Sequence, residues 1–274
     1  MNDDLHAELR ENDRRAYLAA LLAPAEARQD NATLATYALE LARVPLLVSE
    51  PPAGEIRLQW WEEVVRGERD EQASGHPLAA ALRDAASRAG WATMALADMA
   101  DARRFDLYNE PMPDRAAFEG YAGRIASIPI QLAVQRIDPA AANKTAEAAG
   151  HAGVYATLID RLTTLARDRA ANRQFLPSDM LWLAGIAPGT LGSVDAGSDE
   201  ARALVNAALD TADEHLDRTL AARAKLPRST RPAFAAALAR RAHHAEIRRM
   251  GADVFDRLPA LSPLREQWAV WRAS

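Results

Sequence analysis

The stretch from Leu158 to Pro177 reads LIDRLTTLARDRAANRQFLP, and it decides the fold class. Apolar residues recur at helical spacing in its first half, charged residues follow, and a Phe-Leu-Pro sequence ends the helix. Asp160 and Asp168 stand eight positions apart, with Thr164 between them. Because a helix brings positions i, i+4 and i+8 close to one face, two carboxylates flank a hydroxyl along one stripe. Three interpretations are open: a magnesium site, a magnesium site that has lost ligands, or a solvated helix edge.

The same helical spacing of apolar residues continues on both sides of this stretch. Alanine, leucine, arginine and glutamate dominate, and convincing strand alternation is missing. Most prolines fall between the apolar segments, and Asp13 is placed to cap a helix that begins near Arg14. We therefore predict an all-α protein of roughly nine or ten helices that forms a single domain over residues 1–274. Segment 1–13 is predicted to be mobile, and residues 184–198 to form a loop.

Composition narrows the function classes. With 274 residues, of which 49% are hydrophobic, the chain can bury a full core. A formal net charge of −5 gives no support to a nucleic-acid partner, and the lack of cysteine excludes thiolate metal sites and a cysteine nucleophile. The N-terminal sequence has no secretory signal, and no apolar run approaches the roughly 20 residues that span a bilayer. These features predict a cytoplasmic protein with at most peripheral membrane contact.

Three further segments carry side chains that suit a binding site. Residues 54–61, GEIRLQWW, place two tryptophans beside a polar line, and residues 101–113, DARRFDLYNEPMP, crowd arginines and an aspartate around a phenylalanine. Arginine forks suit carboxylates and diphosphates, but helix salt bridges explain the second segment equally well. Residues 240–250, RRAHHAEIRRM, could touch an anionic membrane or an acidic partner, although a solvated helix face is the commoner meaning. The six histidines show no metal-binding spacing.

Taken together, several segments resemble the squalene/phytoene synthase family, all-helical prenyltransferases that join two prenyl diphosphates head to head. The likeness covers most of the chain, from about Tyr17 to Leu258. It rests on YALELARV (37–44), the Trp-Trp segment, DARRFDLY followed by AFEGYAGRIAS (117–127), and the first stretch with its FLP ending. The resemblance implies a helical bundle of the isoprenoid-synthase type.

The most specific match is the first stretch. The family pattern QLTNILRDVxEDxxxGRxYLP fits Thr157 to Pro177 without a gap, with Phe175 in place of the tyrosine. In the family, two aspartates of this motif hold magnesium against a diphosphate. Here the first falls on Thr164 and the second on Asp168, while Asp160 lies one turn upstream. The resemblance therefore predicts a magnesium helix that has lost ligands.

The second family motif, YxFCRxxDDxxD, is more strongly altered. Its aspartates fall on Val44, Pro45 and Val48, and the nearest carboxylates are Glu40 and Glu50. Valine cannot bind magnesium, which prefers octahedral oxygen ligands, and ionising an allylic diphosphate needs the leaving charge neutralised in place. A two-sided magnesium cage is therefore predicted to be absent.

Three hypotheses follow. In the first, the chain is a family member without the usual catalysis, similar to the mitochondrial respiratory complex I assembly factor of phytoene-synthase type. This resemblance implies a prenyl- or lipid-binding protein, or a protein with a membrane-complex assembly partner, peripheral to the inner membrane. The third hypothesis also has no catalysis, and in it the chain is a ligand-free helical scaffold. An apolar tunnel would favour a ligand, whereas a solid core would favour the scaffold.

The second hypothesis is an active prenyltransferase with relocated ligands and Mg²⁺ as its cofactor. The candidate catalytic and metal-binding carboxylates are Glu40, Glu50, Asp160 and Asp168. The candidate residues for the substrate and its diphosphate are Arg43, Arg104, Arg173, Tyr37 and Phe175.

Overall fold

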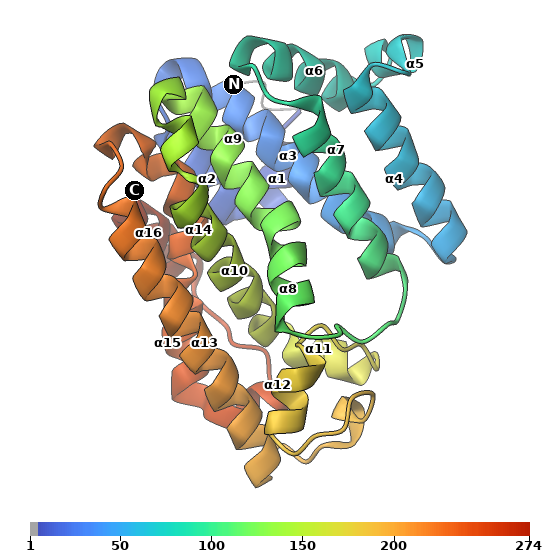
Figure 1. Cartoon of the computed structure of the whole chain (residues 1–274), viewed down its shortest axis with the longest axis vertical. Coiled ribbons are helices and arrows are strands. Elements are labelled where there is room, and N and C mark those ends of the chain that lie inside the picture. Colours follow the sequence, from blue (N-terminus) through green and yellow to red (C-terminus); the bar gives the residue numbers. More distant parts are fainter. Residues whose placement is uncertain (1–4) are drawn as a thin grey trace.

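The computed structural model describes residues 5–274, and throughout this part of the chain the regular elements are helices. They pack side by side around α10 (Ala146–Thr163), which lies in the middle of the molecule (Figure 1). The all-α prediction is confirmed. Over residues 5–274 there are sixteen α-helices rather than nine or ten, because interruptions such as the one at Thr164 divide runs that look continuous in sequence.

The first half of the chain supplies one side of the bundle. Its α-helices are α1 (Ala7–Asn12), α2 (Arg14–Leu22), α3 (Ala25–Leu47), α4 (Pro51–Arg66), α5 (Asp70–Ser74), α6 (Pro77–Ala89), α7 (Thr93–Ala102), α8 (Arg115–Ala122) and α9 (Ile128–Ile137). Shorter helical turns between them are η1 (Arg103–Leu107), the π-helical η2 (Gly123–Ser127) and η3 (Pro139–Lys144).

The second half supplies the other side and the lower end of the bundle in Figure 1. After α10 come α11 (Leu165–Ala170), α12 (Ser178–Leu183), α13 (Asp199–Arg223), α14 (Arg231–Ala239), α15 (Arg241–Met250) and α16 (Pro263–Ala273). The short 3₁₀ turns are η4 (Leu191–Ser193), η5 (Arg228–Thr230) and η6 (Gly251–Phe255). As predicted, residues 184–198 are largely irregular and contain only η4.

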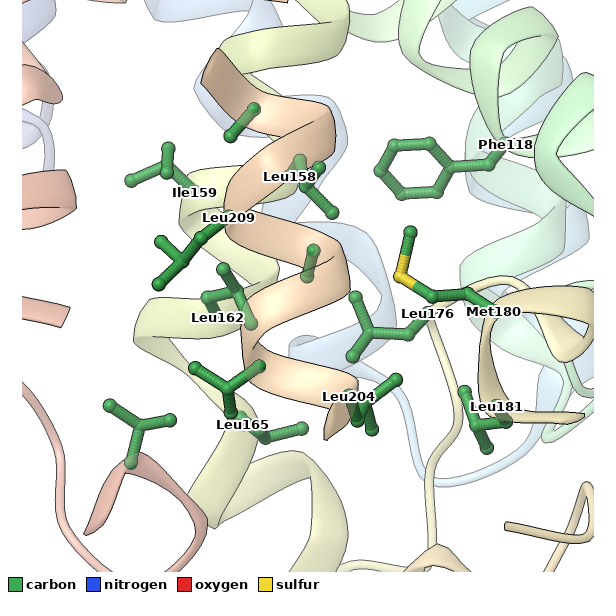
Figure 2. Close-up of a cluster of buried hydrophobic side chains, with 14 of the residues drawn as sticks. Phe118, Leu158, Ile159, Leu162, Leu165, Leu176, Met180, Leu181, Leu204 and Leu209 are labelled. Atoms are coloured by element: carbon green, nitrogen blue, oxygen red, sulfur yellow. The ribbon is translucent and has the colours of Figure 1, made fainter. Parts of the chain in front are cut away.

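The largest core cluster lies where α10 packs against α13. Leu158 and Leu162 of α10 meet Leu204 and Leu209 of α13, and all four are at most 2% exposed (Figure 2). Leu158 and Leu162 stand four positions apart on one face of α10, and Val205 and Leu209 repeat that spacing on α13, so the sequence pattern of each helix creates a continuous apolar seam. This seam fixes α10, and with it the position of Asp160 on the neighbouring part of the same helix.

The segment predicted to be mobile, residues 1–13, lies partly outside the described residues, in residues 1–4. Its described part forms α1, in which Leu9 is fully buried. His6 is also buried and shares a hydrogen bond of 2.8 Å with the Thr36 hydroxyl. Asp13 caps α2 by accepting a hydrogen bond from the backbone N–H of Ala16, which confirms the predicted cap.

A close contact between η2 and α10 shapes the middle of the bundle. Gly153 of α10 faces Ser127 of η2, and a Cβ placed on Gly153 would lie 2.1 Å from the Ser127 Oγ and 2.7 Å from its backbone nitrogen. The two backbones can therefore approach this closely only with a glycine at position 153. A π-helical turn is rare and widens the helix locally, and Ile125 and Ala126 of η2 line the cavity described below.

Across residues 5–274, the helices are either too short or too polar for any of them to cross a bilayer.

Candidate functional site

A cavity of about 350 Å³ lies among α2, α3, α9, α10, α14 and the turn η2. Small apolar side chains make up most of its wall, among them Ala16, Ala35, Ala38, Ala42, Ala126, Ala133, Ala236 and Ala237. Charged side chains also contribute to the wall: Asp13, Arg103, Asp160, Arg161 and Arg240. Because alanine side chains are short, the helices leave a space between them that larger side chains such as leucine would fill.

Asp160 lies on this wall and is held by Arg240. The Arg240 guanidinium donates from Nε and Nη2 to the two carboxylate oxygens of Asp160, at 2.8 and 2.6 Å. Arg15 adds a longer ion pair of 3.7 Å, and the Asp160 side chain keeps 39% of its surface accessible. Burial alone would raise the pKa of Asp160, but Arg240 and then Arg15 outweigh it and lower that pKa below its ordinary value. Asp160 is therefore an ionised carboxylate already occupied by a bidentate partner.

A second charged cluster, formed by Arg103, Asp106, Tyr121 and Arg161, lies beside the first. The Tyr121 hydroxyl donates to Asp106 and accepts from Arg161 at 2.8 Å and Arg103 at 3.3 Å. Arg103 also pairs with Asp106 at 2.9 Å, and burial followed by the charge of Asp106 raises the pKa of Tyr121 to about 12. Two guanidinium groups thus share one carboxylate, which leaves this part of the cavity wall with excess positive charge.

The stripe of Asp160, Thr164 and Asp168 is divided by a break in the helix. α10 ends at Thr163 and α11 begins at Leu165. The Thr164 hydroxyl donates to Asp168 Oδ2 at 2.6 Å, and Asp168 is 7% exposed. Asp168 does not line the cavity, whereas Asp160 does. The two aspartates therefore lie on consecutive helices and engage different partners.

The other two candidate carboxylates lie elsewhere. Glu40 of α3 pairs with Arg57 of α4 at 3.0 Å and borders a separate pocket beside His76. Glu50 is exposed and occupies the N-cap position of α4. Within residues 5–274, no three His, Asp or Glu side chains are grouped so that they could share a metal ion. The four candidate carboxylates do not form one donor set.

The three candidate arginines also have separate surroundings. Arg43 pairs with Glu8 of α1. Arg104 pairs at 2.7 Å with Glu55 of α4 and at 2.7 Å with Asp101. Arg173 is partly exposed after α11. The cavity is lined by other arginines, at positions 103, 161 and 240.

The two candidate aromatic residues differ from each other. Tyr37 is fully buried, donates to the Leu96 carbonyl at 3.0 Å and packs edge-on against Trp61, so it belongs to the core between α3 and α4. Burial raises the pKa of its hydroxyl far above the ordinary value. Phe175 lies under the Arg161 guanidinium, 3.8 Å from ring centroid to Cζ, which holds Arg161 by a cation–π contact.

The sequence interpretation missed the residues that make up the charged part of the cavity wall. It noted the arginines and the aspartate of segment 101–113 but gave salt bridging equal weight, and it did not single out Arg161 or Arg240. One signal was present: Arg161 directly follows Asp160 in the stretch that best matches the family pattern. The contact between Asp160 and Arg240 spans 80 positions and leaves no local pattern.

This arrangement suits an amphipathic ligand. An apolar chamber favours an alkyl or prenyl chain, and guanidinium groups beside it favour an anionic group. Asn31 also lines the cavity, and in the described part of the chain its Oδ1 accepts no hydrogen bond. A ligand hydroxyl could satisfy this buried acceptor.

Comparisons with known proteins agree with this architecture. The chain is 25% identical over 271 residues to bovine "NADH dehydrogenase (ubiquinone) complex I, assembly factor 6", covering 96% of this chain and 80% of that protein. A dehydrosqualene synthase, crystallised with a ligand, superimposes with a TM-score of 0.83 at 17% identity, over 98% of this chain and 94% of its own. Squalene synthase HpnC from Alicyclobacillus acidocaldarius gives 0.75 at 16%, over 91% and 93%. The squalene/phytoene synthase family model matches residues 9–265, and the chain belongs to this family.

Proposed function

We propose that this chain binds a prenyl- or lipid-type ligand in its cavity and serves in the assembly of a respiratory complex, without joining prenyl diphosphates. The observation that carries the proposal is the state of Asp160. Of the four candidate magnesium ligands it alone lines the cavity, and Arg240 occupies both of its oxygens.

Magnesium does not fit this donor set. The ion prefers octahedral oxygen coordination and commonly bridges carboxylates to phosphate. To bind it, Asp160 would have to leave Arg240, whose side chain is only 13% exposed, and a buried guanidinium without its partner costs several kcal/mol, about 3–5 in typical cases. Asp168 is covered and bonded to Thr164, and Val44 and Val48 stand at positions of the other motif. The site therefore lacks the means to neutralise a departing diphosphate with metal.

The cavity supports a ligand-binding protein over a ligand-free scaffold. Its volume of about 350 Å³ lies within the common range for small-ligand pockets, about 300–1,000 Å³. A solid core would fill this space, since unfilled apolar volume costs stability. The chain instead places alanine at many of the wall positions.

The assembly role is supported by the relatives. Bovine assembly factor 6 aligns with 96% of this chain, so the shared region is the whole helical domain. The test is to express this chain in human cells that lack assembly factor 6 and to measure assembled complex I on native gels. Restored complex I supports the role, whereas a folded, correctly targeted chain that restores none contradicts it.

Ligand binding is tested with a cavity-filling variant. Ala38→Phe places a ring in the cavity wall, and Ala53→Phe places the same ring on the exposed start of α4 as a control. Binding of farnesyl diphosphate and of farnesol is measured by calorimetry in the presence of a magnesium chelator. We expect binding to persist under chelation in the wild type and the control, and to be lost in Ala38→Phe.

The family's own reaction is the second candidate, and the cationic wall of the cavity favours it because guanidinium groups can hold a diphosphate. The purified chain is incubated with farnesyl and geranylgeranyl diphosphate, magnesium, and NADPH or none, beside an active family enzyme. Formation of a joined C30 or C40 product, abolished by Asp168→Ala in a folded variant, would overturn the non-catalytic proposal. Unchanged substrate supports it.

A further inference from the structure

The C-terminal helix α16 presents its apolar side to solvent. Leu264, Trp268 and Trp271 are 78%, 57% and 60% exposed. Their spacing of four and three residues places them on one helix face. The two tryptophan rings lie 5.0 Å apart, centroid to centroid. They form one continuous stripe, hereafter the α16 stripe, rather than scattered single residues.

The opposite face of α16 is the one that packs on the protein, and it is made of smaller side chains. Val270 is buried, and Ala269 and Ala273 pack beside it against α2 and α14. A surface helix normally turns its larger apolar residues inward. The reversed order on α16, at the edge of the bundle in Figure 1, indicates that the stripe is covered by something outside the chain.

Basic side chains lie beside the stripe. On α16 itself, Arg265 and Arg272 are exposed and lie along one border of the stripe. The neighbouring α15 is tied to α16 by a 4.0 Å ion pair between Arg265 and Glu246, and it adds three exposed arginines, at positions 241, 248 and 249. Arg248 pairs with Asp213 and Arg249 with Glu246, each at 2.5 Å. Residues 241–274 hold six arginines and four acidic residues, in a chain whose formal net charge is −5. The basic surface is therefore local.

We infer that the α16 stripe docks on the surface of an anionic lipid bilayer. Tryptophan rings suit the membrane interface because they combine a large apolar body with a polar N–H, and arginines beside them attract anionic headgroups. A second copy of the chain is a poorer occupant, since pairing two such stripes brings two arginine-rich borders together. Because α16 packs on α2 and α14, which line the cavity on their inner side, docking would hold the cavity close to the lipid surface.

The test measures co-sedimentation of the full chain with vesicles of phosphatidylcholine, with and without phosphatidylglycerol. We expect binding to the anionic vesicles that weakens as salt rises. The double variant Trp268→Gln/Trp271→Gln should lower the partition coefficient by about tenfold or more, from the exposed apolar area it removes. Arg265→Gln/Arg272→Gln should lower it only on anionic vesicles.

The matched control is Trp182→Gln on α12, which removes a tryptophan that is 64% exposed but lies outside the stripe. It should bind vesicles as the wild type does. Equal losses in Trp182→Gln and in the stripe variant would overturn the inference, and so would wild-type binding by the stripe variant or failure of the folded wild type to bind. The inference would also be overturned if the wild type formed a dimer that the stripe variant does not form and neither protein bound vesicles. The stripe would then serve self-association.

Discussion

The ion pair of Asp160 and Arg240 gives a quantitative prediction. Arg240 is 13% exposed and donates two charge-assisted hydrogen bonds to Asp160. Breaking a fully buried pair typically costs about 3–5 kcal/mol. Since the Asp160 side chain is 39% exposed, water screens part of the charge, and we expect Asp160→Asn to lower the free energy of unfolding by about 2 kcal/mol.

The assay is a double-mutant cycle of Asp160→Asn, Arg240→Gln and their combination, followed by urea and thermal unfolding. A loss of about 2 kcal/mol corresponds to a fall in melting temperature of roughly 4–8 °C for a chain of this size class. The combined variant should be less destabilised than the sum of the two singles, with a coupling energy of about 1.5 kcal/mol or more. Asp217→Asn, at an exposed site on α13, is the control and should change stability by at most about 0.5 kcal/mol.

The pH dependence of the coupling adds a second check. A carboxyl whose pKa is lowered in the folded state stabilises the fold above its unfolded pKa, 3.8 for Asp160, and loses that contribution as the pH falls through the folded value. The coupling should therefore be equal at pH 7 and pH 5 and should decline only under more acid conditions. A coupling below about 0.5 kcal/mol at pH 7 would refute the claim that Arg240 occupies Asp160.

Three further outcomes are expected in urea unfolding. Gly153→Ala should lower the free energy of unfolding by about 2 kcal/mol, since its Cβ would overlap Ser127. Gly150→Ala, on the same helix with nothing within 4 Å of the added atom, should be neutral or stabilising. Equal effects of the two variants would contradict the close approach of α10 and η2. Burial, followed by the charge of Arg15, lowers the pKa of His243 to about 4 from 6.5, so its contribution to stability should fall by about 2 kcal/mol between pH 6.5 and 4. His243→Asn should reduce the pH slope by that amount, and the slope that remains includes His215 and His244, whose pKa values burial also lowers. Asp30→Asn should cost about 3 kcal/mol, because Asp30 is 2% exposed and pairs with arginines of α6 and α9; a loss under 1 kcal/mol would contradict this.

Much of the fold could be predicted because it rests on local patterns. Apolar residues at helical spacing in α10 and α13 produced the seam between those helices, and the cap at Asp13 followed from residue type alone. The replacement of motif carboxylates by Val44 and Val48 is likewise visible without coordinates. Such features depend on neighbours within one or two helical turns, where spacing determines geometry.

The charged part of the cavity wall could not be predicted because it depends on side chains that are distant in sequence. Arg240 reaches Asp160 from the junction of α14 and α15, and Tyr121 joins arginines from η1 and α10. Tyr37 illustrates the same limit, because its motif position does not reveal its surroundings, and the structure places it in the core between α3 and α4. Which face of a helix meets which neighbour is set by the packing of the whole bundle.

The π-helical turn η2 has a consequence for how the cavity could change during evolution. Such a turn accommodates one more residue than an α-helical turn, and each residue advances an α-helix by about 100°. Deleting a single residue within 123–127 would therefore remove the local widening and join α8 and α9 in one regular helix, with α9 keeping its present register. Pro129, Ile130 and Ala133 of α9 would keep their places in the cavity wall, and only the part that Ile125 and Ala126 of η2 line would change. A one-codon deletion would thus reshape one side of the cavity while leaving the helix that follows in place.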